Sequence, residues 1–170
     1  FGDPHFKSEQ MRAHELGYRI QAGRRISFDL AGFWNAYRNL EGGRVSTLYV
    51  EEEPKPLHWV VPLVLSNTVE GSASGAEATG VWNVTSAWKL AGGYSWLRIR
   101  LRSTSPQPLP DETRAQGESP DHQVHVRSCL DLPRGLSLDA AIYHIGSLSA
   151  SEGWMARPGV PAYTRVDARL

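Results

Sequence analysis

Several features that define common classes of protein are missing or scarce in this sequence. Its 170 residues include a single cysteine, Cys129, which excludes an internal disulfide and a four-cysteine metal site. No apolar run approaches about 18 residues, so the sequence predicts no transmembrane helix. The 18 basic side chains balance 18 acidic ones. No nucleic-acid-reading motif accompanies them, so we expect no nucleic-acid partner.

Sustained helical periodicity is also missing, and an alternation of apolar and polar residues takes its place. In residues 12–21, Leu16, Tyr18 and Ile20 share one side and mostly polar residues share the other. A period of two residues predicts β-strands with one apolar and one polar face. The alternation occurs in seven segments: 12–21, 26–37, 73–84, 88–103, 122–132, 136–146 and 163–170.

The connections between these segments alternate in length. Short turns occupy 22–25, 85–87 and 133–135, whereas long connections occupy 38–72, 104–120 and 148–161. Consecutive strands of a meander run antiparallel, so we expect all the long connections at one end of the sheet. Outer-membrane barrels have short turns at one end and long loops at the other, and a Greek-key sandwich has no reason to sort its loops in this way. Within 38–72 we expect 45–65 to form a hairpin-like excursion or a strand extension, with Pro62 away from a central ladder position.

The two predicted faces differ in chemistry. Mixed charges gather on the polar face, which suits a wet lumen: Glu15, Arg19, Asp29, Glu77, Lys89, Arg127, Asp139, Arg165, Asp167 and Arg169. Aromatic residues gather at strand ends: Trp34, Tyr37, Tyr94 and Trp96 near the long connections, and Trp82 and Trp88 beside a short turn. This placement is typical of the two interfacial girdles of a membrane barrel. The predicted fold is therefore all-β, an antiparallel up-and-down meander of about seven strands of about 9–12 residues, forming part of a transmembrane barrel.

One irregularity interrupts the pattern inside the stretch 77–132. Up to Trp96 the even positions of 88–103 are apolar or aromatic, but beyond it Leu97, Ile99 and Leu101 are the apolar ones. Arginines occupy the intervening positions, Arg98, Arg100 and Arg102. A β-bulge would produce this change of phase, and so would a strand that leaves one environment for another.

Several stretches carry a family resemblance. Lys7-Ser8-Glu9 followed by His14-Glu15-Leu16-Gly17-Tyr18-Arg19 is similar to the pattern SE…yElGyR, and Ile26 to Asn35 is similar to l.ldlaaFyn. Asn67 followed by Gly75-Ala76-Glu77 is similar to N…GvE, with Ala76 in place of the more usual Val; Tyr94 to Leu97, Pro120 to Gln123 and Pro161 to Asp167 continue the order. Together these stretches resemble the C-terminal barrel of TonB-dependent outer-membrane receptors.

The resemblance implies a barrel of about 22 strands filled by an N-terminal plug. It implies import of scarce ligands such as iron–siderophore chelates or cobalamin, energised by the TonB complex through an N-terminal box. On this basis we expect residues 1–170 to be a fragment of the barrel domain, with the plug, the TonB box, a signal sequence and the terminal strands outside it. Partners would be outer-membrane lipid, the plug, the TonB complex and a small metal chelate.

No residue is assigned a catalytic, cofactor-binding or metal-binding role, and no cofactor is expected. His122 and His125 have odd spacing, which places them on opposite faces of a strand and separates them as ligands. Cys129 has no catalytic partner nearby in sequence, and Glu51-Glu52-Glu53 is interpreted as a solvated loop tip. Arg98, Arg100 and Arg102 would attract an anionic chelate at the external mouth; solubilising strand residues are the simpler interpretation.

A soluble β-sandwich that binds carbohydrate through tryptophan stacking is the alternative function. The two hypotheses differ in what they predict for the apolar face. A sandwich buries Leu16, Phe28, Val124 and Leu138 against a second sheet, whereas a barrel wall turns the same side chains outward to lipid.

Overall fold

The computed structural model describes residues 3–109, 113–151 and 156–170. The first two residues of the N-terminal segment lie outside this range, as do 110–112 of the predicted loop 104–120 and 152–155 of the predicted loop 148–161. The main sheet has seven strands: β1 (Gln10–Ala22), β2 (Ile26–Val45), β5 (Leu63–Asn83), β6 (Trp88–Ser103), β7 (His122–Leu132), β8 (Leu136–Ile145) and β9 (Tyr163–Arg169). Neighbours in the sheet follow this same order, and every pair is antiparallel.

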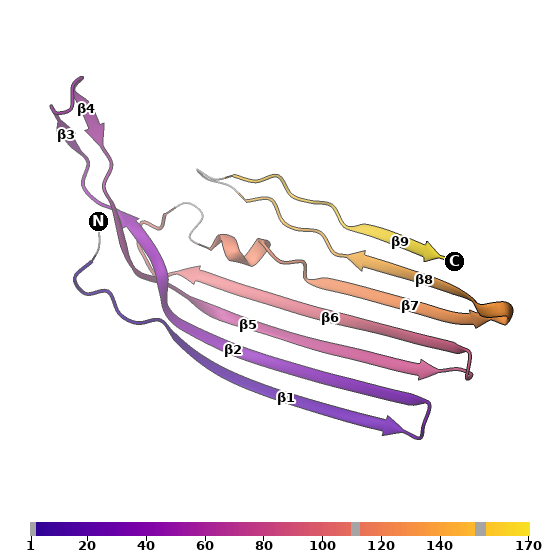
Figure 1. The fold of residues 1–170 in the computed structure, drawn as a ribbon. Coiled ribbons are helices and arrows are strands. Elements are labelled where there is room, and N and C mark those ends of the chain that lie inside the picture. Colours follow the sequence, from indigo (N-terminus) through magenta and orange to yellow (C-terminus); the bar gives the residue numbers. More distant parts are fainter. Residues whose placement is uncertain (1–2, 110–112, 152–155) are drawn as a thin grey trace.

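The predicted meander is therefore confirmed, as is the sorting of its connections. Short turns join β1 to β2, β5 to β6 and β7 to β8 at one end of the sheet, and the longer segments lie at the other end (Figure 1). The turn between β7 and β8 is the 3₁₀ segment η2 (Pro133–Gly135), in which Arg134 adopts a left-handed conformation with φ 68°. The long segment before β7 contains a second 3₁₀ turn, η1 (Arg114–Gly117).

The connection predicted over 38–72 is wrong in extent, because β2 and β5 continue far into it. Their pairing extends to Val45 opposite Leu63, so the strands have 20 and 21 residues, and β6 has 16. These lengths also correct the expected strand length of about 9–12 residues. The predicted hairpin in 45–65 is confirmed by β3 (Tyr49–Glu51), which pairs with β4 (His58–Val60). Pro62 lies between β4 and β5, where its carbonyl accepts a hydrogen bond from Ser46 N–H at 2.9 Å.

An amide side chain stabilises the point where β2 loses its regular register. The β2–β5 pairing shifts between Tyr37 and Leu40, where Asn39 has a left-handed φ of 56°. Asn67 Nδ2 donates hydrogen bonds to the carbonyls of Asn39 at 2.6 Å and Lys7 at 2.9 Å, and Asn67 Oδ1 accepts one from Lys7 N–H at 2.5 Å. Asn67 therefore connects the N-terminal segment to both strands and satisfies backbone groups at the irregularity.

No bulge occurs in β6, so that explanation of the phase change after Trp96 is wrong. The β5–β6 register continues without a shift from Asn83 opposite Lys89 to Val69 opposite Ser103. Trp96 and Arg98 therefore project from the same face of one regular strand. The other explanation, a strand that passes from one environment into another, stays a prediction.

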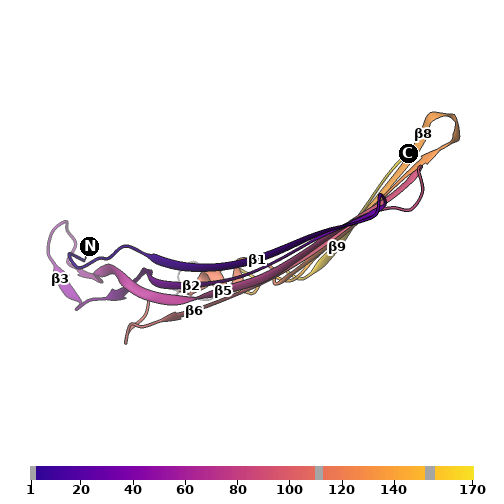
Figure 2. The ribbon, with the colours of Figure 1, turned by 90° about the horizontal axis from the view of Figure 1, so that it is seen from below.

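The sheet is a single curved and twisted layer (Figure 2). Leu16 is 81% exposed, Phe28 48%, Val124 37% and Leu138 40%. Among the described residues the buried apolar side chains are small or few: Val69, Ala73 and Ala141, together with Pro62. The sandwich alternative requires a second sheet packed over these residues, and the described part of the chain does not form one there.

Candidate functional site: two faces and the loop end of the sheet

The register assigns the side chains of the sheet to two faces. We call apolar face the side formed by Leu16, Tyr18, Ile20, Phe28, Leu30, Trp34, Trp82, Leu90, Tyr94, Trp96, Val124, Val126, Leu138, Ile142 and Val166. We call polar face the opposite side, which carries Glu15, Arg19, Asp29, Glu77, Lys89, Arg127, Asp139, Arg165 and Asp167. The sequence-based assignment of these charges to one face is confirmed.

Oppositely charged residues pair along the polar face. Arg19 forms an ion pair with Asp29, the residue directly opposite it on β2. Arg127 Nη2 lies 3.2 Å from Asp139 Oδ2 across β7 and β8, and Arg165 Nη2 lies 2.9 Å from Asp167 Oδ2 on β9. These charges are largely exposed and need water or a polar neighbour around them, because hydrocarbon would not solvate them.

The polar face also carries a row of ring contacts that runs from β6 to β9. The rings of His125 and Tyr143 stack with centroids 6.3 Å apart, and Arg165 Cζ lies 4.6 Å from the centre of the Tyr143 ring. Gly93 lies directly opposite His125, and a Cβ on Gly93 would come within 2.5 Å of the His125 ring. The absence of a side chain at Gly93 therefore allows the His125 ring to lie across β6.

The aromatic residues of the apolar face form two groups. Trp34, Tyr94 and Trp96 lie partway along their strands, and the Tyr94 hydroxyl is 2.8 Å from His122 Nδ1. At the short-turn end, Trp82 and Trp88 are 47% and 37% exposed, and Trp88 Nε1 donates to Ser128 Oγ at 2.9 Å. Tyr94 and Trp88 thus present an apolar ring while their polar atoms are hydrogen-bonded, as is typical of interfacial residues of membrane proteins.

Tyr37 does not belong with these rings, although the sequence placed it near them. It lies opposite Gly71, in the register position of the polar face, and its hydroxyl accepts a bond of 3.5 Å from Asn35 Nδ2. Sequence position alone placed Tyr37 near a strand end. The observed strand continues to Val45, so Tyr37 lies inside a paired segment.

The three arginines singled out in the sequence lie on β6 beyond Trp96, on the same side of the sheet as Tyr94 and Trp96. Arg98 is opposite Ser74, Arg100 is opposite Ser72 and Arg102 is opposite Glu70. Arg102 forms an ion pair with Glu70. Their attraction of an anionic chelate at an external mouth stays a prediction.

The other residues considered from the sequence have simple surroundings. His122 and His125 project from opposite faces, as their spacing predicts: His122 contacts Tyr94, and His125 contacts Tyr143. Cys129 is half-buried opposite Asp139. Glu51 lies opposite His58 in the exposed hairpin, with 3.7 Å between Oε2 and Nε2.

Groups of three or more metal-ligating side chains are not found among the described residues. Within the described ranges, helices that combine the length and apolar character needed to span a membrane are likewise not found.

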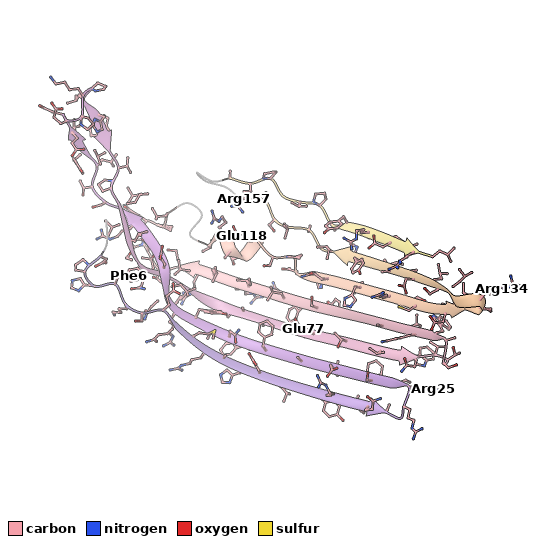
Figure 3. The ribbon with its side chains drawn as sticks, viewed as in Figure 1. Phe6, Arg25, Glu77, Glu118, Arg134 and Arg157 are labelled. Carbon is pink, nitrogen blue, oxygen red and sulfur yellow. The ribbon has the colours of Figure 1, made fainter. Side chains whose placement is uncertain are left out.

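The loop end contains a feature that the sequence analysis missed. Glu118, just after η1, forms ion pairs with two arginines: its Oε1 lies 2.8 Å from Arg114 Nε and 3.6 Å from Arg157 Nη1. Glu118 and Arg157 come together there, whereas Arg25 and Arg134 lie at the short-turn end (Figure 3). A groove of about 730 Å³ between the two long segments is lined by Thr113, Gln116, Ser149, Ser151 and Pro158, among others. Only the i,i+4 spacing of Arg114 and Glu118 is visible in the sequence, because Arg157 belongs to a different loop.

Comparisons with known proteins agree with this geometry. A family model described as TonB dependent receptor-like, beta-barrel, matches residues 1–170. A search of curated protein sequences gives no match. Among solved structures, the FrpB iron transporter from Neisseria meningitidis (F3-3 variant) is similar with a TM-score of 0.70 and 11% identity, over 96% of this chain and 24% of its own.

Two further receptors share the fold. The siderophore receptor PirA from Acinetobacter baumannii has a TM-score of 0.62 and 13% identity, over 93% of this chain and 24% of its own. The ferric-catecholate import receptor Fiu from K12 E. coli, in its closed form, has a TM-score of 0.67 and 20% identity, over 98% of this chain and 21% of its own. This chain therefore spans about a quarter or less of each of these proteins. Because the family model matches residues 1–170 and the fold coincides with parts of these receptors, the chain belongs to the TonB-dependent receptor β-barrel family.

Proposed function

We propose that the chain forms part of the wall of a bacterial outer-membrane receptor that imports a scarce iron chelate. The observation that carries this proposal is the exposed apolar face of a one-layer sheet whose other face holds ion pairs. Exposed apolar side chains are stable in contact with lipid, and paired charges are stable in a water-filled lumen. The family likewise implies an outer-membrane location.

The free edges of the sheet support a position within a larger barrel. The outer edges of β1 and β9 have no neighbouring strand among the described residues. Unpaired N–H and C=O groups are costly in hydrocarbon, so a bilayer requires partner strands on both sides. We place residues 1–170 in a barrel domain of about 22 strands, with the remaining strands and the plug supplied by other parts of a longer receptor. The polar face would then surround the plug. The TonB complex would energise transport through the N-terminal box, outside residues 1–170.

The choice of ligand is supported by the structural neighbours. Their names refer to iron, to a siderophore and to ferric catecholate, so we favour an iron–siderophore chelate over cobalamin for this chain. The loops at the long-connection end would meet the ligand first. The role of the strands is that of a scaffold, and we assign the chain no enzymatic reaction.

The membrane placement is tested by thiol labelling of the natural-length receptor in intact outer membranes. Cys129→Ser removes the thiol of this chain, and a cysteine is then placed at Thr79 or at Val126. These two sites lie in the central part of the sheet on opposite faces. We expect a water-soluble maleimide to label position 79 and to leave position 126 unlabelled. Equal labelling at both positions would contradict the wall assignment.

Transport is tested separately in cells that depend on this receptor. Radioactive iron supplied as a ferric catecholate should accumulate when TonB is intact and should not accumulate in a strain without TonB. Accumulation that is independent of TonB would overturn the transport assignment without affecting the membrane placement.

A further inference from the structure

Five arginines lie on the side of the apolar face, beyond its aromatic residues toward the long-connection end. We call them the basic rows: Arg12, Arg38, Arg98, Arg100 and Arg102. Arg12 is opposite Ala36, which is in turn opposite Ser72 and, across β5, Arg100. The cross-strand register thus aligns side chains from the N-terminal part of the sheet with those of β6.

The surroundings of Arg98 and Arg100 leave both guanidinium groups uncovered. Their cross-strand partners are the small residues Ser74 and Ser72, and both arginines are exposed. Neither forms an ion pair with a described residue, whereas Arg102 pairs with Glu70. Alternate residues of a strand are about 7 Å apart, so Arg98 and Arg100 present two neighbouring positive charges on one face.

The location of these charges points to the chemistry of a partner. They continue the apolar face past Trp34 and Trp96, and aromatic residues of this kind mark the level of lipid headgroups. Beyond that level, a side chain on the lipid side of a wall meets the headgroups themselves. The odd-numbered positions of the same segment, such as Leu97 and Ile99, project to the other side, toward the lumen.

We propose that the basic rows bind the phosphate groups of outer-leaflet lipopolysaccharide, with Arg98 and Arg100 as the main contacts. The inference rests on the proposed membrane placement of the wall. A guanidinium presents paired N–H donors that match phosphate oxygens, and it keeps its charge at every physiological pH. A free anionic chelate is the other source of the same chemistry, but its route lies on the lumen side, away from these two side chains.

Lipid binding by the purified natural-length receptor tests the proposal. Arg98→Gln/Arg100→Gln removes two uncovered charges, and Arg24→Gln/Arg25→Gln removes two charges from the short turn at the opposite end. The probes are lipopolysaccharide, the same lipid after enzymatic removal of its phosphates, and a ferric catecholate, each titrated in detergent. We expect the first variant to bind lipopolysaccharide on the order of tenfold more weakly than wild type. We expect the turn variant to bind it as wild type does.

Each outcome of the titrations bears on the proposal. Loss confined to the phosphorylated lipid and to the Arg98/Arg100 variant supports it. Equal lipopolysaccharide affinity for that variant and wild type would overturn it, and so would equal losses in the two variants. Weaker binding of the ferric catecholate with unchanged lipid binding would overturn it in favour of ligand attraction.

Thiol labelling at positions 79 and 126 separates this inference from the proposed function. A receptor that shows the expected labelling contrast but binds lipopolysaccharide without help from Arg98 and Arg100 refutes only the inference. A receptor without the labelling contrast refutes the wall assignment itself.

Discussion

The two halves of β6 have the same register and opposite polarity. From Trp88 to Trp96 the strand pairs with β7, and its even positions are apolar or aromatic while Lys89 and Ser95 face the polar side. From Leu97 to Ser103, Arg98, Arg100 and Arg102 occupy those even positions.

We call Trp88 to Trp96 the inner half of β6 and Leu97 to Ser103 its outer half. The apolar residues of the outer half project from the polar face, where they pack against neighbouring residues. Ile99 lies opposite the buried Ala73, and Leu101 lies opposite Gly71 so closely that a Cβ on Gly71 would collide with it. The N–H of Leu101 donates to Gln116 Oε1 of η1 at 3.0 Å. Because the register of β6 does not change at Trp96 while its apolar side does, the proposed wall explains the difference by a change of medium near Trp96, from hydrocarbon to headgroups and water.

A charge placed on the apolar face of the inner half should have the largest effect. Val126, which is 50% exposed on the apolar face, would face hydrocarbon, so Val126→Arg should lower the free energy of unfolding by about 2–4 kcal/mol. Ser74→Arg, on the same face between Trp96 and the long-connection end, should cost less than about 1 kcal/mol, because water and headgroups would surround the new charge and the main penalty would be its repulsion by Arg98 directly opposite. Denaturant unfolding of the receptor from phospholipid bilayers measures the change in unfolding free energy for each variant. Equal changes would contradict a difference in environment between the two halves of β6.

A side chain added where the two halves meet should have an intermediate effect. A Cβ on Gly75 would lie 2.5 Å from the Phe33 ring and 2.8 Å from the Trp96 carbonyl. Gly75→Val should therefore destabilise the receptor by about 1–3 kcal/mol through overpacking.

A matched glycine on the neighbouring strand is the control for this change. A Cβ on Gly32 would have only the Gly75 carbonyl within reach, at 3.8 Å, so Gly32→Val should change stability by no more than about 0.5 kcal/mol. Phe33→Ala should restore part of the loss in Gly75→Val. If it does not, Phe33 is not the obstacle.

The smallest effect is expected at the loop end. Glu118→Gln removes the carboxylate that contacts Arg114 and Arg157, and these partly exposed pairs contribute below about 1 kcal/mol. Global stability should hardly change, while hydrogen exchange of the η1 amides should become faster. Glu52→Gln, in the exposed hairpin, should leave that exchange unchanged. A global loss as large as that of Gly75→Val would show that the loops stabilise the wall itself.

Much of the fold follows from local sequence pattern. The segments 88–103 and 122–132 coincide with β6 and β7, because apolar and polar residues alternate along both and a tight turn bounds one end of each. The polar face was also predictable, since the period of two fixes which charges share a side. Which charges pair, such as Arg127 with Asp139, depends on register and required the structure.

The outer parts of β2 and β5 were missed for a physical reason. Gly42, Gly43 and Gly71 lie in the predicted connection 38–72 and have low strand propensity, so local pattern indicates a loop there. Pairing between the two strands overrides that preference, and Asn67 accommodates the irregularity at Asn39. Arg98, Arg100 and Arg102 were visible in the sequence, but their alignment with Arg12 was not, because it depends on the pairing across β1, β2 and β5.

The length of the β2–β5 hairpin determines what an approaching molecule encounters first. At about 3.3 Å per residue and a tilt of about 40°, 21 residues rise by about 50 Å, against about 30 Å of hydrocarbon. In the proposed orientation β2 and β5 extend beyond the outer surface of the bilayer, and the β3–β4 hairpin lies at their outer end. The exposed tip of this hairpin carries three glutamates, Glu51 to Glu53, and one lysine, Lys55. Its net negative charge would repel an anionic ligand before any loop nearer the membrane could hold it.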